Sequence, residues 1–274
     1  MMQTRLSHGS FYGSVVSRRA VSEFLLNETV YPAGARIPRH SHEDGYFCLV
    51  RQGNYSEAYG VKKRACGPFT FAFHPPGEMH SEQFGDTEAR SFNIEITSDW
   101  LDRMRVYSVH LDGPAHFQGG PLAALALKLY REFQSADPVS HIAIEGLILE
   151  IVAEASRRLR TPGGAKAPPW LDRVRDILHE SFARAPVLSN IAASVGVHPV
   201  YMAAAFKRHY RCTVGEYVRQ RRLEFACRQL ATSANTLAEI AVQAGFADQS
   251  HFSRTLKNSL GVTPGQYRAQ HSLN

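Results

Sequence analysis

Cysteine is scarce in this sequence, and its few cysteines show neither disulfide nor metal-binding spacing. There are four, far apart and without a C-x-x-C pair: Cys48, Cys66, Cys212 and Cys227. A disulfide framework and a zinc knuckle both need closely spaced cysteines, so neither is indicated. We expect four reduced and mostly buried thiols.

Signatures of membrane proteins and of common enzyme classes are missing as well. No stretch approaches the roughly 18 uncharged apolar residues of a membrane span, and residues 1–10 lack the apolar core of a signal peptide. No P-loop, Gly-rich dinucleotide fingerprint, Ser/His/Asp or Cys/His constellation can be argued from the spacing. We therefore expect a cytoplasmic protein that has no membrane partner and is not an enzyme.

Positive charge is unevenly distributed along the 274 residues. The whole chain has 31 Lys and Arg against 25 Asp and Glu, a net charge of +6. Residues 161–169 are rich in proline and glycine, which predicts an exposed linker. Residues 1–169 hold 18 residues of each sign, whereas residues 170–274 hold 13 basic and 7 acidic ones. The excess lies in the C-terminal part, which favours a polyanionic partner over the alternative of a merely soluble basic domain.

The N-terminal part has the pattern of a β-barrel. Between residues 21 and 97, short apolar runs are separated by glycines, and the clearest run places Phe69, Phe71 and Phe73 on one face of a strand. Many short strands at this spacing predict a barrel or jelly roll.

Helical periodicity begins near residue 121. Leu122, Leu125, Leu129 and Phe133 form one apolar stripe. Residues 144–152 form a second, after a break near Asp137 and Pro138. This helical pair either covers the barrel or pairs with another subunit.

The chain after the linker is predicted to be entirely helical. Expected helices span residues 170–183, 191–195 with Ser189 as N-cap, 199–209, 237–244 and 249–260, with a last one from Pro264. Between them, Thr213 and Glu216 have the spacing of a capping box, which predicts the start of a long helix that continues through Leu230.

Two segments of this helical part repeat each other. Residues 191–197 align with residues 240–246, and both have a glycine at the same place, Gly196 and Gly245. Small residues where helices cross, a glycine turn and a following amphipathic helix are the requirements of a helix-turn-helix. Two copies in a basic domain predict two such units.

Residues 238–257 (AEIAVQAGFADQSHFSRTLK), followed by Gly261-Val-Thr-Pro264 and Tyr267-Arg268, resemble the signature of the AraC/XylS family of bacterial transcription regulators. Residues 188–222 fit the family's other helix-turn-helix, although Arg211 stands where a glycine is more usual. The resemblance implies two subdomains, bridged by a helix from Thr213 to about Ala231, that set two recognition helices into successive major grooves. It also implies double-stranded promoter or operator DNA as partner, a nucleoid-associated location and contact with RNA polymerase.

Helix geometry assigns roles in the second recognition helix, where Phe252 and Leu256 must face the core. The residues expected to read bases are Gln249, Ser250, Ser253 and Arg254. Arg254 is the strongest candidate because its fork matches guanine O6 and N7. Lys257 and Arg268 are expected at phosphates.

The first recognition helix offers mainly small apolar side chains to the bases: Val200, Ala203 and Ala204. These can meet thymine methyl groups. Phosphate contacts are expected from Lys207, Arg208 and His209. We expect this half to supply affinity and the second half to supply discrimination. Arg219, Arg221 and Arg222 of the bridging helix either touch phosphate or form a solvated face.

Gly34-x5-His40-x-His42, Gly53 and Pro75-Pro-Gly77-Glu-Met-His80 resemble the two motifs of the cupin barrel. Tyr46 or Phe47 stands where that pattern has a Glu, and Phe84 replaces its Asn. We therefore expect no cofactor and prefer a structural role for His40, His42 and His80. A divalent metal on these three histidines is the alternative, with Glu43 or His74 as substitute ligands.

The predicted fold is thus a multidomain α and β protein. It has a cupin-like jelly-roll sensor barrel (1–115), a helical dimerisation or packing segment (116–160), a linker (161–169) and an AraC-type DNA-binding domain (170–274) with helix-turn-helix units at about 188–209 and 237–260. The expected effector pocket holds Tyr46, Phe71, Phe73, His40, His42 and His80. The predicted function is a homodimeric, effector-controlled transcription regulator. The alternatives are a metal-dependent cupin enzyme with a DNA-docking tail and a constitutive regulator with an empty barrel.

Overall fold

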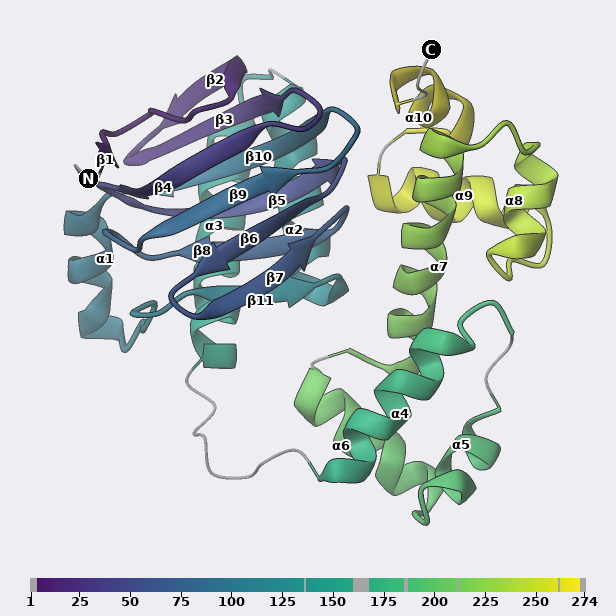
Figure 1. The fold of residues 1–274 in the computed structure, drawn as a ribbon. Helices are drawn as coiled ribbons and strands as arrows, with labels where there is room; N and C mark the ends of the chain where they lie inside the picture. The colour runs from purple at the N-terminus through teal and green to yellow at the C-terminus, as the bar shows by residue number, and fades with distance from the viewer. Residues whose placement is uncertain are drawn as a thin grey trace. The chain divides into compact units, whose positions relative to one another are not determined.

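The structure is a computed structural model that describes residues 4–135, 137–159, 168–184, 187–210, 212–260 and 262–271. The chain forms two compact units, one of residues 1–118 with 122–161 and one of residues 162–274 with 119–121 (Figure 1). Most of the expected linker, residues 161–167, and Arg211 lie outside the described residues.

Two sheets form the barrel of the first unit. The five-stranded sheet has the order β1 (Thr4–Leu6), β4 (Arg36–His42), β9 (His80–Phe84), β6 (Tyr55–Tyr59) and β7 (Lys62–Cys66). The six-stranded sheet has the order β11 (Ala115–Gln118), β8 (Thr70–His74), β5 (Gly45–Gln52), β10 (Ala89–Ile96), β3 (Phe24–Tyr31) and β2 (Ser14–Val21). The last strand, β11, continues past the expected end of the barrel at residue 115.

The central strands of the six-stranded sheet, β8, β5, β10 and β3, send alternate side chains to two buried faces. On one face Phe92 of β10 packs on Tyr130 and Phe133 of α2 (Gly120–Gln134), with ring centroids 5.2 and 5.1 Å apart. The other face carries Tyr46 of β5 and its cross-strand partner His74 of β8, whose rings stack 4.5 Å apart. The barrel interior therefore lies on the Tyr46 side, and helix packing fills the other side.

The predicted helical pair covers the barrel. Helix α2 is followed by α3 (Ser140–Leu159), whose predicted core positions are all buried: Ile144, Leu147, Ile148, Ile151 and Val152. Figure 1 shows both helices behind the sheets. The break between them ends at Asp137. Its carboxylate accepts hydrogen bonds from the backbone N–H groups of Val139 and Ser140, where α3 begins. A short helix α1 (Ser98–Met104) and the 3₁₀ turn η1 (Arg105–Tyr107) were not predicted.

Seven helices are described in the second unit: α4 (Pro169–Glu180), α5 (Leu188–Ser194), α6 (Pro199–Tyr210), α7 (Val214–Thr232), α8 (Leu237–Gln243), α9 (Gln249–Leu260) and α10 (Pro264–His271). The capping box of Thr213 and Glu216 at the start of α7 is confirmed. The prediction of Ser189 as an N-cap is wrong, since α5 begins at Leu188 and Ser189 lies inside it. None of the described helices is both long and apolar enough to cross a membrane.

The internal repeat is visible in the packing of the second unit. Ile191 and Ala192 of α5 are buried in one core, and their counterparts Ile240 and Ala241 of α8 are buried in the other. Gly196 and Gly245 both have a positive φ, +71° and +82°. The glycines thus supply the left-handed turn that joins the two helices of each unit. The four cysteines form no disulfide within the described residues, and all four are buried, as predicted.

Candidate functional site

The second helix-turn-helix unit consists of α8, a tight turn and α9. Thr236 caps α8 with a capping box: its hydroxyl accepts from the N–H of Glu239, and its own N–H donates to the Glu239 carboxylate at 2.7 Å. Gly245 turns the chain, and the fully buried Phe252 and Leu256 hold α9 in the core. This packing fixes which face of α9 points outward.

The outward face of α9 carries the polar side chains predicted to read bases. Gln249, Ser250 and Arg254 are exposed, whereas Ser253 is half-buried. Gln249 and Ser250 begin the helix, and Arg254 lies one turn later, where its Nε donates to the Ser250 carbonyl at 3.3 Å. That bond uses one of five guanidinium donors. A helix start and an arginine on one face suit entry into a major groove.

Two residues near this face, Asp248 and His251, were not predicted from the sequence. Asp248 precedes α9, and its carboxylate accepts from the backbone N–H of His251 at 2.6 Å. An Asp just before a helix is a frequent N-cap, so the signal was present in the sequence. His251 is exposed, and its ring meets that of Phe246 edge-on at 5.4 Å.

Helix α6 presents a different surface. Val200 and Ala204 are exposed and Ala203 is half-buried. Tyr201 lies beside them, 52% exposed, with its ring 5.8 Å from that of Trp170. The basic side chains expected at phosphates are exposed at the C-terminal end of the helix: Lys207, Arg208 and His209. The first helix-turn-helix unit therefore combines an exposed apolar surface with a basic end.

The two residues of the second helix-turn-helix unit that are predicted to contact phosphate differ in their surroundings. Lys257 is exposed on α9. Arg268 is half-buried, and its guanidinium donates to the backbone carbonyl of Asn235. Arg268 thus fastens α10 to the segment between α7 and α8, because this hydrogen bond joins residues that are 33 positions apart.

The three arginines of α7 separate into two groups. Arg221 donates to the buried carboxylate of Glu224, and Arg222 donates to the backbone carbonyl of Phe182 at 2.8 Å. Arg219 is exposed. Only Arg219 of the three is therefore placed to meet phosphate without breaking an internal hydrogen bond.

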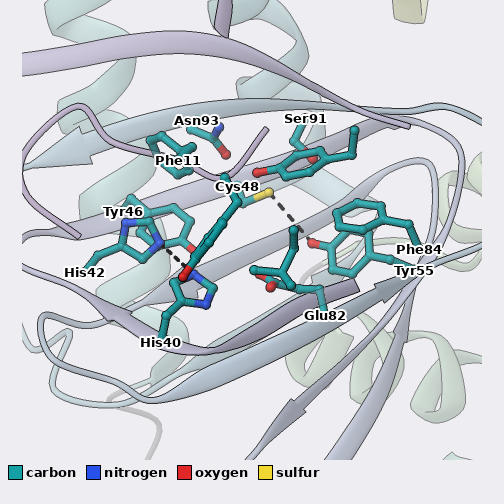
Figure 2. Close-up of a pocket in the computed structure, with 13 residues that line it drawn as sticks. Phe11, His40, His42, Tyr46, Cys48, Tyr55, Glu82, Phe84, Ser91 and Asn93 are labelled. Carbon is teal, nitrogen blue, oxygen red and sulfur yellow. Dashed lines mark hydrogen bonds between the residues drawn. The ribbon is translucent and has the colours of Figure 1, made fainter. Parts of the chain in front are cut away.

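The barrel encloses a small cavity (Figure 2). Among its lining residues are Phe11, Tyr12, His40, His42, Tyr46 and Glu82. The space open to the centre of a water-sized sphere is about 20 Å³, which suffices for one water or ion. A drug-sized ligand needs a pocket of about 300 Å³ or more. An organic effector would therefore have to displace side chains from this interior.

Two aromatic residues expected in the pocket lie elsewhere. Phe71 and Phe73 of β8 pack on Phe47, with ring centroids 5.1 and 4.7 Å apart. All three occupy the face of the sheet that the helices cover, whereas Tyr46 and His74 occupy the inner face. The cavity walls instead include the aromatic residues Phe11, Tyr12, Tyr31, Tyr55 and Phe84.

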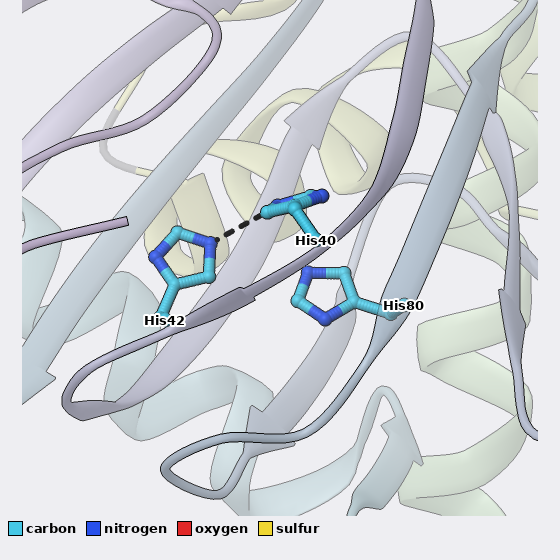
Figure 3. A group of neighbouring side chains, drawn as sticks. All are labelled: His40, His42 and His80. Carbon is cyan, nitrogen blue, oxygen red and sulfur yellow. Dashed lines mark hydrogen bonds between the residues drawn. The ribbon is translucent and has the colours of Figure 1, made fainter. Parts of the chain in front are cut away.

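The three motif histidines do come together, as Figure 3 shows. His40, His42 and His80 each offer a nitrogen within 4.8 Å of the others. Nε2 of His40 and Nε2 of His42 are hydrogen-bonded at 3.2 Å, so these two rings already pair with each other. The position of the motif carboxylate is taken by Tyr46, whose hydroxyl bonds Nε2 of His80 at 3.1 Å. The motif positions therefore do not form the three-histidine and carboxylate site of metal-binding cupins.

The histidines differ in electrostatic surroundings. Burial, reinforced by the neighbouring rings of His80 and His40, lowers the pKa of His42 to about 2. Burial also lowers the pKa of His40. Burial opposes protonation of His80 too, but the carboxylates of Glu82 and Glu57 outweigh it and raise its pKa. Protonation is thus favoured at His80 and disfavoured at the His40 and His42 pair.

Two family models match the chain. An AraC-like ligand binding domain matches residues 28–152, and a helix-turn-helix domain matches residues 191–270. The two matches correspond to the barrel with its helices and to the repeated helical unit.

Relatives of the chain are named as transcription regulators. Transcriptional activator NphR from Rhodococcus sp is 35% identical over 268 residues, which are 89% of this chain and 75% of NphR. The transcriptional activator RhaR from Cronobacter sakazakii is 27% identical over 262 residues, 88% of this chain and 89% of RhaR. A putative AraC-like transcription regulator from Streptomyces lividans is 31% identical over 188 residues, 65% of this chain and 60% of that protein.

Proposed function

Because the chain belongs to the AraC/XylS family of transcription regulators, we propose that its two helix-turn-helix units occupy successive major grooves of a promoter. The chain combines a ligand-binding domain with a DNA-binding domain. One observation carries the proposal: Gln249, Ser250 and Arg254 are exposed on α9 while Phe252 and Leu256 of the same helix are buried.

The two helix-turn-helix units have different roles in this proposal. Arg254 reads a guanine through O6 and N7, and Gln249 and Ser250 contact neighbouring base edges. Lys257 contacts phosphate, which sets the position of the helix without specifying a base. The first helix-turn-helix unit supplies affinity through the basic end of α6. It contacts thymine methyl groups through Val200.

The barrel controls this binding through an effector and performs no turnover. The polar and aromatic lining of the cavity supports a binding role, with His40, His42, Tyr46 and the adjacent His80 as contacts.

The protein acts as a homodimer on the chromosome in the cytoplasm. Exposed apolar residues support dimerisation: Ile142 and Leu149 lie seven residues apart on α3, and Val139 directly precedes the helix. Since NphR and RhaR are named activators, we extend the proposal to recruitment of RNA polymerase.

Binding to single-base variants of an operator tests the division of roles. Sites would first be recovered from the genome by immunoprecipitation of the full chain, and affinities then measured at two salt concentrations. We expect each mismatched base pair under the second helix-turn-helix unit to cost about 1–3 kcal/mol of binding free energy, and mismatches under the first helix-turn-helix unit to cost less. Stronger base preference in the half-site of the first unit would contradict the proposal.

A further inference from the structure

His80 lies between two different groups of side chains that could bind a metal ion in the five-stranded sheet. Its strand β9 is flanked by β4, where His40 is the direct partner of His80, and by β6, where Glu57 is the partner of Glu82. Side chains two residues apart on a strand share a face, so His80, Glu82 and Glu57 all face the interior. His80 therefore has a histidine on one side and a carboxylate on the other.

A third ligand reaches the Glu57 side from the opposite sheet. Nδ1 of His74 on β8 lies 3.3 Å from Oε1 of Glu57, and the rings of His74 and His80 are 4.7 Å apart. One ligand atom from each of Glu57, His74 and His80 lies within 4.8 Å of the others. The three residues are 1%, 2% and 1% exposed.

Some polar atoms of this group lack a partner, whereas both nitrogens of His80 are hydrogen-bonded, Nε2 to the Tyr46 hydroxyl and Nδ1 to the Glu78 carbonyl. Nδ1 of His74 is buried and finds no hydrogen-bond partner among the described residues, despite its closeness to Glu57. Oε2 of Glu78, 3.6 Å from the same nitrogen, is also unpartnered within the described part of the chain. Buried polar groups without a protein partner are rare in folded proteins unless a bound water or ion satisfies them.

Arg64 orients the carboxylate of Glu57. Its guanidinium bonds Oε2, which directs Oε1 toward His74. Outer contacts that fix a ligating carboxylate in this way are a regular feature of metal sites. The guanidinium is itself held over the ring of Tyr59 at 4.6 Å.

The charge of the region favours a cation. Glu57, Glu78 and Glu82 contribute three carboxylates, and Arg64 balances only one of them. Oε1 of Glu82 lies 3.4 Å from Nε2 of His80, and Oε2 of Glu78 lies 3.6 Å from Nδ1 of His74. Two further carboxylates therefore adjoin the proposed imidazole ligands.

We propose that the barrel binds one divalent transition-metal ion between Glu57, His74 and His80, on the opposite side of His80 from the motif pair His40 and His42. Two imidazoles and one carboxylate are the donor set of first-row metals such as Fe²⁺, Co²⁺ and Zn²⁺, whereas Mg²⁺ and Ca²⁺ prefer oxygen alone. Sγ of Cys66 lies 3.9 Å from Oε2 of Glu57, the oxygen that is bonded to Arg64, and is not among the proposed ligands. The proposal goes beyond the regulatory function and does not depend on it.

Titration of the full chain with Co²⁺ tests the site. The protein would be stripped with a chelator, and binding followed by calorimetry and by the visible d–d absorption bands of Co²⁺. We expect one Co²⁺ per chain, displaced by Zn²⁺. E57Q and H74F should each weaken binding by at least about tenfold, whereas H40Q and H42Q should leave it unchanged.

The variant E28Q is the matched control. Glu28 is also a buried carboxylate bonded to an arginine, at 3.2 Å from Arg51, but it lies on the helix-covered face away from the histidines. E28Q should keep full binding. Thermal unfolding of each metal-free variant checks that it folds, and E57D, which keeps the charge but withdraws the carboxylate, replaces E57Q if that variant does not.

Two results would overturn the proposal. One is a wild-type chain that takes up no Co²⁺. The other is binding that survives E57Q and H74F and is lost in H40Q or H42Q, which would place the ion at the motif positions. Operator binding is not a readout in this experiment, so failure of the regulatory function would leave either result unchanged.

Discussion

Gly245 faces the backbone carbonyl of Ala183 so closely that a Cβ at position 245 would lie 2.0 Å from its oxygen. The contact joins the turn of the second helix-turn-helix unit to the segment that follows α4. Gly196, the repeat counterpart of Gly245, has a similar positive φ but no atom within 4 Å of the corresponding Cβ position. The two glycines are equivalent in backbone conformation and different in packing.

This difference predicts unequal costs for the same substitution. Gly196→Ala should cost about 1–2 kcal/mol in free energy of unfolding, because it adds only left-handed strain. Gly245→Ala should cost about 1–3 kcal/mol more, since the methyl group also displaces backbone. Urea unfolding of the full chain measures both, and equal costs would show that the Ala183 contact is unimportant.

Truncation of Arg254 and truncation of Lys257 should change DNA binding in different ways. Arg254→Ala should cost about 1–3 kcal/mol in operator binding and relax the preference at one base pair. Lys257→Ala should weaken all sequences alike and reduce the salt slope by about 1. Fluorescence anisotropy with operator and random duplexes at several salt concentrations separates the two effects. Loss of a base preference in the Lys257 variant would reverse the assignment.

Arg268 should behave as a structural residue. Removing its side chain leaves the Asn235 carbonyl without this donor, and loss of a hydrogen bond to a charged group costs about 1.5–3 kcal/mol. We expect Arg268→Ala to lower the urea midpoint and to leave the salt slope of DNA binding unchanged. A smaller salt slope with unchanged stability would restore the phosphate contact predicted from the sequence.

The barrel should lose stability in acid through His42. Its pKa is about 2 in the folded chain and near 6.5 when unfolded, so below pH 6.5 the unfolded state binds the extra proton. Stability from this residue falls as pH falls, by up to about 1.4 kcal/mol per unit. His80 acts in the opposite direction, because its raised pKa stabilises the fold at low pH and this contribution is lost as pH rises.

Urea unfolding of the chelator-treated chain at pH 7 and pH 5 checks this sign. The wild type should be less stable at pH 5, and His42→Phe, which retains a ring beside Phe11 and Tyr46, should show a smaller difference between the two pH values. An unchanged difference in the variant would mean that His42 does not remain neutral in the folded state.

The helical part was largely predictable from sequence because its signals are local. The capping box of Thr213, the glycine turns and the spacing of Phe252 and Leu256 each act within a few residues. The hydrogen bond from Arg268 to Asn235 was not predicted, because the two residues are 33 positions apart in the chain and meet only after folding.

The barrel interior was less predictable, since its contents depend on strand pairing. Alternation places Phe71 and Phe73 on one face and Thr70 and His74 on the other, but every residue of β8 is buried, so exposure does not distinguish the two faces. His74 was named as a possible ligand and Glu57 was missed, because β6 adjoins β9 only through the sheet register. The cupin-like motif led to His40, His42 and His80 and gave no information about the residues on the other side of His80.

A footprint on sites recovered from the genome is the most direct test of promoter binding by the two helix-turn-helix units. We predict sequence-specific protection of two major-groove segments about 10 bp apart on one face of the duplex, with the contact under the second helix-turn-helix unit lost in Arg254→Ala. Binding without enrichment of any sequence, or protection of a single groove segment that Arg254→Ala leaves unchanged, would contradict it.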